Sequence, residues 1–264
     1  MTSAPTSPGL PPLPDQRTAV VTGAGGAAGI GRVTARILAE NGWHVALVDT
    51  NADGLADVEA ELRGAGHSDV LTVPADVASE SSVSHAFDRI DAGLPPVVGL
   101  VNLAGIASPV PLHECDLKDF ERVMAVNVTG SFLMLKAAAP RMIRQGVGRI
   151  VNTSSITAFD GGGTFSKGVY ATAKAAVIGM CHGGARELGP YGITVNVLAP
   201  GPIDTEIMGG RLTDERKAAM SAGIPLGRVG RTAEVAATIA FLLSEGAGYI
   251  NGATIQIDGG KHMH

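Results

Sequence analysis

The sequence predicts an α/β protein with one doubly wound parallel sheet and helices on both of its faces. Short apolar runs rich in β-branched residues alternate with longer helical stretches, which is the pattern of such a sheet. A glycine-rich turn joins the first apolar run to the first helical stretch. The chain has 264 residues, of which 45% are hydrophobic, so one domain with a large core is expected.

Seven strands are predicted from the apolar runs. The first run, RTAVVT, and the second, WHVALVD, flank a helix expected at 29–41, and the three elements form one βαβ unit. The later strands are the runs VLTVPA, VVGLVN, GRIVNTS, ITVNVL and ATIQID. In chain order, the seven strands are expected at residues 17–22, 43–49, 70–75, 97–102, 148–154, 193–198 and 253–258. Two long helices are expected at 117–144 and 168–188.

The first 16 residues differ from the rest of the chain. They contain five prolines but neither a basic segment nor an apolar segment of the kind found in secretory signals. We therefore expect residues 1–16 to form a flexible proline-rich leader and residues 17–264 to form a single domain. The two cysteines form no CxxC pair, which favours a cytoplasmic protein.

Charge and composition argue against several kinds of partner. The net charge is -5, and no run of Lys or Arg forms the basic stripe that nucleic acid requires. No apolar run reaches about 18 residues, so no membrane association is expected. The seven histidines have no paired ligand spacing, so no metal site is expected either. A small-molecule partner fits this composition.

The glycine-rich turn TGAGGAAGIGR predicts dinucleotide binding. It follows the first strand and opens the first helix, where backbone N–H groups and the helix N-terminus can hold a pyrophosphate. Asp49 ends the second strand 20 residues after Gly29, where a carboxylate can accept from a ribose 2'-hydroxyl. Its charge would repel a 2'-phosphate, and Thr50 and Asn51 offer no cation, so NAD is expected over NADP. Arg32 is the nearest cation that could weaken this preference.

Tyr170 and Lys174 predict acid–base chemistry. They lie four residues apart in YATAK, so on a helix their side chains share one face. A free phenol has a pKa of about 10, and a nearby ammonium group favours its ionised form. We therefore expect Lys174 to lower the pKa of Tyr170, so that the phenol can exchange a proton with an alcohol.

From Arg17 to Gly260 the chain resembles the short-chain dehydrogenase/reductase family, whose domain is Rossmann-like. Several motifs carry the resemblance in the same order along the chain. They are Thr22-Gly23 to Gly29-Ile30-Gly31, Asp76-Val77, Asn102-Leu103-Ala104-Gly105, Asn127, Ser155, Tyr170 with Lys174, Pro200-Gly201-Pro202-Ile203-Asp204-Thr205, and Asp258-Gly259-Gly260.

The resemblance implies a catalytic set of Asn127, Ser155, Tyr170 and Lys174. Tyr170 would exchange the hydroxyl proton, Ser155 would bond the substrate oxygen, and Lys174 would also donate to the nicotinamide ribose, with Asn127 holding a water. The implied cofactor residues are Gly23, Gly29, Ile30, Gly31, Asp49, Asp76, Val77, Asn102, Ala104, Gly105, Tyr170, Lys174, Pro200, Gly201, Ile203 and Thr205. A homotetramer or homodimer packed through the two long helices is also implied.

Two spacings depart from the family pattern. The turn between Gly23 and Gly29 is two residues longer than usual, and so is the segment between Ser155 and Tyr170. The second excess falls in residues 160–168, which we expect to border the substrate. Substrate contacts are expected from Ser155, Ile156, Phe159 and Met208, the last within a lid over residues 204–228.

The predicted function is NAD-dependent interconversion of a secondary alcohol and a ketone. The alcohol could be a polyol, a sugar, a hydroxy acid or a similar compound. One alternative is an NADPH-dependent 3-oxoacyl reductase, because that branch of the family has the same motifs. The other is a nucleotide-binding scaffold without turnover, because a fold alone does not establish catalysis.

Overall fold

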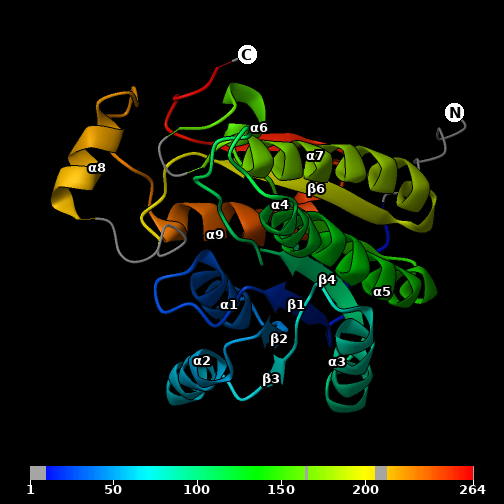
Figure 1. The fold of residues 1–264 in the computed structure, drawn as a ribbon. Helices are drawn as coiled ribbons and strands as arrows, with labels where there is room; N and C mark the ends of the chain where they lie inside the picture. The colour runs from blue at the N-terminus through cyan, green and yellow to red at the C-terminus, as the bar shows by residue number, and fades with distance from the viewer. Residues whose placement is uncertain (1–9, 164–165, 206–212, 264) are drawn as a thin grey trace, which may run out of the picture.

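Seven parallel strands form one sheet in the order β3-β2-β1-β4-β5-β6-β7. The structure is a computed structural model, and it describes residues 10–163, 166–205 and 213–263. The strand order reverses between β1 (Thr18–Thr22) and β4 (Val97–Asn102), which are direct neighbours. In a doubly wound sheet this switch point opens a crevice at the carboxyl ends of the strands. The predicted fold class is confirmed, and Figure 1 shows the helices on both sides of the sheet.

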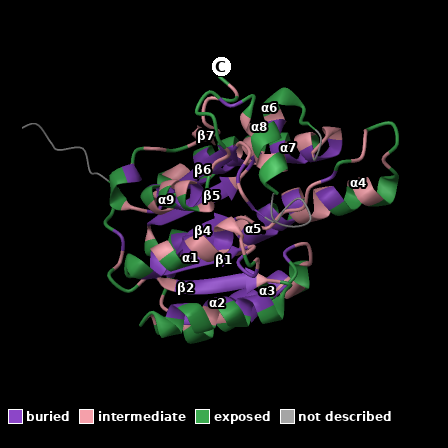
Figure 2. Cartoon of the chain, turned by 90° about the vertical axis from the view of Figure 1, so that its left-hand side faces the viewer, coloured by how far each residue is buried: buried purple, intermediate pink, exposed green. Residues whose placement is uncertain are grey.

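The strand predictions agree with the structure to within two residues at each end. β1 and β4 pair through their centres, with Val20 opposite Leu100. The remaining strands are β2 (His44–Asp49), β3 (Val70–Pro74), β5 (Gly148–Thr153), β6 (Ile193–Pro200) and β7 (Thr254–Ile257). All eight residues of β6 are buried, as expected of a strand covered on both faces. Figure 2 shows the buried strands between more exposed helices.

Two helical layers cover the sheet. One face is covered by α1 (Ile30–Glu40), α2 (Ala52–Gly64) and α9 (Thr232–Leu242), whose apolar sides share a core with β1 and β2. The other is covered by α3 (Glu80–Gly93), α5 (Gly130–Gln145) and α7 (Gly168–Leu188). Shorter helices are α4 (Leu117–Met124), α6 (Thr157–Asp160) and α8 (Asp214–Ser221).

Side chains at the helix starts help to fix these boundaries. Asn51, Ser79 and Asp116 each accept a hydrogen bond from a backbone N–H in the first turn of the helix that follows. Such a cap satisfies one of the N–H groups that a helix end leaves without an internal partner. The helix predicted at 168–188 has the same bounds in the structure.

The helix predicted at 117–144 is not a uniform α-helix. A π-helical turn, Ala125–Thr129, separates α4 from α5, and Asn127 lies at its centre. The side-chain amide of Asn127 donates to the carbonyl of Val123 four residues earlier, at 2.9 Å. That carbonyl would normally accept from the backbone of residue 127, so the side chain competes with the helix, and π turns of this kind are frequent at functional sites.

The stretch Leu117–Gln145 has a length and a mean hydropathy of 1.3 that would, by themselves, allow a membrane crossing. Its apolar residues include Leu133, Met134 and Met142, which are buried in the core beneath α5. The core of this domain therefore accounts for the apolar character of the stretch.

Residues 10–16, the described part of the expected leader, lie against the domain. Leu13 is buried, and its N–H donates to Glu245 at 3.1 Å. Glu245 in turn lies near the guanidinium of Arg149, a fully buried side chain on β5 that donates to the carbonyl of Gly148. These contacts lie near Gly148, at the amino end of β5. The predicted site residues lie at the opposite edge of the sheet, after the carboxyl ends of the strands.

Candidate active site

The first strand ends in a turn that is packed tightly against the end of β4. Gly23 has a positive φ of 69°, and a Cβ at this position would lie 2.9 Å from the backbone nitrogen of Ala104. Thr22 holds the same segment, because its hydroxyl oxygen accepts from the N–H groups of Leu103 and Ala104, both at 3.0 Å. Gly23 is thus fixed in place despite the longer turn, and only a glycine fits this position.

The lengthened part of the turn is bound to the end of β2. The N–H of Gly25 donates to one carboxylate oxygen of Asp49 at 2.9 Å, and the N–H of Asn51 donates to the other at 3.0 Å. The amide of Asn51 donates to the carbonyl of Gly25 at 3.1 Å. Asp49 therefore lies beside the glycine turn, as its spacing from Gly29 predicts, with its orientation fixed by two backbone donors.

The helix that follows begins at Ile30, and Gly31 packs directly onto the backbone of Gly23 and Ala24. Gly29 and Gly26 face each other across the turn, with the Gly29 N–H donating to the carbonyl of Gly26 at 3.3 Å. The turn therefore presents backbone groups and a helix N-terminus, which suit a pyrophosphate.

The cation that could weaken the preference for NAD, Arg32, is paired with another residue. Arg32 lies in the first turn of α1, and its guanidinium contacts Glu61 of α2 at 2.6 and 2.7 Å. This pair neutralises the charge that could otherwise attract a 2'-phosphate.

The ends of β3 and β4 place the next predicted cofactor residues on the same edge of the sheet. Asp76 is exposed, and its carboxylate accepts from the N–H of Ala78 at 2.9 Å. Val77 is buried against Gly130 of α5, where a Cβ would lie 2.7 Å from the valine side chain. Asn102 is buried and donates to Asn152 at 2.9 Å, joining the ends of β4 and β5.

Tyr170 and Ser155 meet at the carboxyl end of β5. Ser155 follows that strand, and its hydroxyl donates to Thr157 at 3.0 Å. Tyr170 is on α7, is only 8% exposed and forms a hydrogen bond with Ser155. Burial raises the pKa of Tyr170 to about 12, and the bond with Ser155 opposes that rise. Thr157 is not among the residues predicted from the sequence.

The raised pKa of Tyr170 corrects the expectation that Lys174 leaves it low. Nζ of Lys174 lies 5.4 Å from the centre of the Tyr170 ring and donates to the carbonyl of Thr153 at 2.9 Å. Burial also lowers the pKa of Lys174 to about 8, so the lysine loses its charge at a lower pH than a free lysine does. In the protein alone, desolvation of the phenol therefore sets the pKa of Tyr170, and Lys174 does not bring that pKa down.

Asn127 approaches the same lysine from the π turn. A Cβ added to Gly105 would lie 2.7 Å from Oδ1 of Asn127 and 3.3 Å from Nζ of Lys174, so both atoms face this glycine. The amide of Asn127 donates to Val123 and Ile106, whereas its Oδ1 is buried and has no hydrogen-bond partner among the described residues. A buried acceptor without a partner is costly, and a bound water would satisfy it.

The segment after β6 lies beside this site. The carbonyl of Pro200 accepts from the N–H of Ile156 at 3.1 Å, which ties the segment to the loop of Ser155. Gly201 packs so closely on Asp258 that a Cβ would lie 2.7 Å from the aspartate side chain. Ile203 and Thr205 are both buried. The segment is therefore held firmly up to residue 205.

The predicted lid is only partly described. Asp204 forms an ion pair with Lys217 of α8 at 2.7 Å, which joins the short helix to the segment after β6. Met208 lies outside the described residues. Ile224 and Leu226, which follow α8, pack on Gly259 near the C-terminus.

Near the predicted substrate residues the structure adds His262. Ile156 is buried, while Phe159 on α6 is exposed and stacks on the His262 ring, with ring centres 5.3 Å apart. Asp258 accepts from the N–H of His262 at 2.7 Å and from that of Gly260 at 2.9 Å, which orients this C-terminal segment. No local motif indicates His262, since its contact joins residues far apart in sequence.

In the lengthened segment after Ser155, the structure describes the residues on either side of 164–165. Gly161 and Gly162 both have positive φ, and the N–H of Gly163 donates to the carbonyl of Ser166 at 2.7 Å. The Ser166 hydroxyl is 3.3 Å from that of Thr157, the partner of Ser155. The hydroxyl of Thr157 therefore connects Ser166 to the predicted catalytic serine, Ser155.

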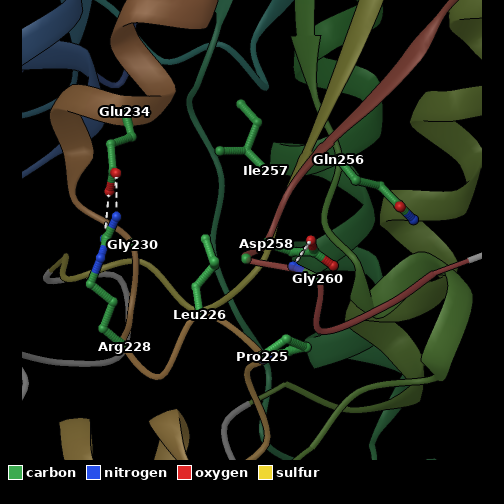
Figure 3. A pocket seen from close by; sticks show the side chains of 10 residues that line it. Pro225, Leu226, Arg228, Gly230, Glu234, Gln256, Ile257, Asp258 and Gly260 are labelled. Carbon is green, nitrogen blue, oxygen red and sulfur yellow. Dashed lines mark hydrogen bonds and ion pairs between the residues drawn. The ribbon is translucent and has the colours of Figure 1, made fainter.

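A pocket of about 510 Å³ lies between β7 and the start of α9. Figure 3 shows Arg228 and Glu234 paired on one side, with Leu226 and Asp258 across from them. Because the Arg228 guanidinium is paired with Glu234, this wall carries little net charge. Within the described ranges, no three His, Cys, Asp or Glu side chains gather as metal ligands would.

Comparison with known proteins agrees with this geometry. A family model described as enoyl-(acyl carrier protein) reductase matches residues 23–262. The cis-4-hydroxycyclohexanecarboxylate dehydrogenase of Sinomonas cyclohexanicum is 44% identical, over 93% of this chain and 96% of that protein. The 3-oxoacyl-acyl-carrier-protein reductase of Aquifex aeolicus is 37% identical, over 92% of this chain and 96% of that protein.

A crystal structure of a short-chain type dehydrogenase/reductase from Mycobacterium marinum has a TM-score of 0.88 and 34% identity, covering 96% of this chain and 98% of that one. The chain belongs to the short-chain dehydrogenase/reductase family. It is therefore an oxidoreductase that acts on CH–OH donors with a nicotinamide cofactor and a small-molecule substrate.

Proposed function

We propose that this protein is an NAD-dependent oxidoreductase that interconverts a secondary alcohol and a ketone. The observation that carries the cofactor choice is the position of Asp49. Its carboxylate is held beside the glycine turn by the N–H groups of Gly25 and Asn51. A 2'-phosphate there would be repelled, and Arg32 is paired with Glu61 instead of facing it.

The residues around the crevice fit a dinucleotide. The close packing of Gly23 and Gly31 leaves backbone groups facing the start of α1, where a pyrophosphate would be held. At one end of the dinucleotide, Asp49 would accept hydrogen bonds from the ribose hydroxyls. At the other end, Lys174 would donate a hydrogen bond to the nicotinamide ribose. When bound, the dinucleotide supplies the hydride acceptor or donor.

The chain itself would move the proton. In oxidation, the phenolate of Tyr170 takes the proton from the alcohol, and in reduction the phenol returns it to the carbonyl oxygen. Ser155, which bonds Tyr170, would donate to the same substrate oxygen. Lys174 would stabilise the phenolate, and a water on Oδ1 of Asn127 would connect the lysine to solvent.

We place the substrate among small secondary alcohols such as polyols, sugars and hydroxy acids. Among these substrate classes, hydroxy acids are supported by one relative, which is named cis-4-hydroxycyclohexanecarboxylate dehydrogenase in Sinomonas cyclohexanicum. Ile156 and Phe159 would provide an apolar wall beside Ser155.

The direct test is a screen of polyols, sugars, hydroxy acids and cyclic alcohols for NADH formation, repeated with NADP+ in place of NAD+. The proposal expects at least one alcohol to be oxidised, with a higher kcat/KM for NAD+ than for NADP+. Faster turnover with NADP+ across the panel would overturn the proposed cofactor preference.

An NADPH-dependent 3-oxoacyl reductase is the second candidate, because a relative 37% identical to this chain carries that reductase name. Asp49 disfavours it, as a 2'-phosphate would meet a carboxylate. Reduction of a 3-oxoacyl thioester with NADPH, measured beside the alcohol screen with NAD+, distinguishes the two candidates.

We also propose that the protein is a homodimer or homotetramer packed through α5 and α7. Small residues recur every four positions on α7, and a Cβ added to Gly179 would have no described atom within 4 Å. Phe132 on α5 is 48% exposed. Mass measurement in solution tests this, and a monomer at micromolar concentration would contradict it.

A further inference from the structure

The longer glycine turn raises the question of what holds its extra residues. The two additional residues leave more backbone to be ordered when a dinucleotide binds. Gly25 and Gly26 lie in this turn, and glycine loses more freedom on ordering than any other residue. A turn that is ordered beforehand avoids part of this cost. The side chain of Asn51 contacts both this turn and the first turn of α2.

We propose that Asn51 is a positioning residue for the cofactor, because it holds the lengthened turn against the start of α2. The proposal rests on the proposed use of a dinucleotide at this turn. Asn51 acts through Gly25 and need not touch the cofactor itself.

The two ends of the Asn51 amide have different partners. Its Nδ2 donates to the carbonyl of Gly25 at 3.1 Å, and its Oδ1 accepts from the N–H of Gly54 at 3.1 Å. The amide thus connects the turn directly to the first turn of α2. Its backbone N–H also donates to Asp49 at 3.0 Å, so the same residue orients the carboxylate proposed to select NAD.

Close packing supports the same connection. A Cβ at Gly54 would overlap the carbonyl oxygen of Gly25 and the amide of Asn51. A Cβ at Gly25 would in turn lie 3.0 Å from the carbonyl oxygen of Asn51 and 3.1 Å from the carboxyl carbon of Asp49. Gly25, although it lies in a loop, is buried. The turn and the start of α2 therefore pack closely together. Figure 1 shows α1, which follows the turn, beside α2 on the same face of the sheet.

The two roles of Asn51 can be separated by substitution. Asn51→Ser keeps an oxygen that caps a helix well, but it is too short to reach Gly25 and lacks the amide donor. Asn51→Ala loses the cap and the donor together. If Asn51 only caps α2, the serine variant should behave like the wild type, whereas a role in holding the turn makes both variants bind the cofactor poorly.

The experiment measures NADH binding by fluorescence titration of the full-length protein, with thermal unfolding of the same samples. We expect Asn51→Ser and Asn51→Ala to weaken NADH binding on the order of fivefold, which corresponds to the loss of one hydrogen bond. Only the alanine variant should unfold at a clearly lower temperature. Asp116→Ala is the matched control, because it removes the cap of α4 and touches no part of the turn. Its NADH affinity should not change.

Hydrogen exchange of the unliganded protein gives a second readout. The backbone amides of residues 23–29 should exchange faster in Asn51→Ser than in the wild type, and equally fast in Asp116→Ala and the wild type. Wild-type NADH affinity and wild-type exchange in Asn51→Ser would overturn the inference. A wild-type protein that binds NADPH but not NADH would instead contradict the proposed function, and the same variants would then be compared with NADPH.

Discussion

Lys174 lies on the same face of α7 as Tyr170, yet its ammonium nitrogen is 5.4 Å from the centre of the phenol ring and bonds the carbonyl of Thr153. In the proposed mechanism, this position lets the lysine donate to a ribose while it acts on the phenol. Burial opposes the charged form of both groups, raising the pKa of Tyr170 to about 12 and lowering that of Lys174 to about 8. In the proposed mechanism, charge or hydrogen bonds added by the cofactor and the substrate would favour the phenolate of Tyr170.

The lowered pKa of Lys174 makes stability depend on pH. Between pH 8 and the unfolded value of 10.5, the unfolded chain holds a proton on this lysine that the folded chain has lost, so stability rises with pH in this window. The gain is at most about 3 kcal/mol. Denaturant unfolding of the wild type and Lys174→Met, both without cofactor, measures it.

The difference between those two stability curves should grow from pH 8 to about pH 10 in favour of the wild type. A difference that stays constant with pH would show that Lys174 titrates alike in the folded and unfolded chains. Above pH 10 the raised pKa of Tyr170 lowers the stability of both proteins as the pH rises, because the unfolded chain loses the phenol proton before the folded chain does.

Removing the charge of Asp49 should narrow the preference for NAD+. Asn at this position keeps an oxygen for the N–H of Gly25, so the turn stays in place while the repulsion of a 2'-phosphate is lost. We expect Asp49→Asn to raise kcat/KM for NADP+ about tenfold relative to that for NAD+. An unchanged ratio of the two values would place the source of specificity elsewhere.

Gly23→Ala should destabilise the fold far more than Gly42→Ala. Both glycines have positive φ, which costs an alanine about 1 kcal/mol, but only Gly23 has backbone atoms of Ala104 within 3.1 Å of a new Cβ. Gly42 has none within 4 Å and serves as the control. Denaturant unfolding should show a further loss of about 2 kcal/mol or more for Gly23→Ala. Equal losses would mean that β1 and β4 separate easily at this point.

His262→Ala should change how the substrate binds, while leaving the cofactor unaffected. The substitution removes the ring that stacks on Phe159, beside Ser155. With the best alcohol from the screen, we expect KM for the alcohol to change at least threefold, with the KM for NAD+ unchanged. Met263→Ala, one residue later and 79% exposed, is the control. If both variants match the wild type, the C-terminal segment plays no part in the substrate pocket.

The sequence predicted the strands well because most apolar runs, such as VVGLVN at β4, form largely buried strands between turn residues. Local spacing also indicated that Tyr170 and Lys174 share a helix face. The π turn could not be predicted, since it depends on Asn127 bonding both a helix carbonyl and Ile106. The contact of His262 with Phe159 depends on the C-terminal fold, and the raised pKa of Tyr170 on burial, which spacing does not show. The assigned roles of the site residues, the NAD preference and the oligomer stay predictions.

Tyr170→Phe tests the central claim most directly, because it removes the hydroxyl that exchanges the proton and keeps the buried ring. NADH formation from the best alcohol should fall at least a hundredfold, while NADH binding stays within about twofold of the wild type. Retention of wild-type turnover by Tyr170→Phe would contradict the account, because the proton would then pass through another group.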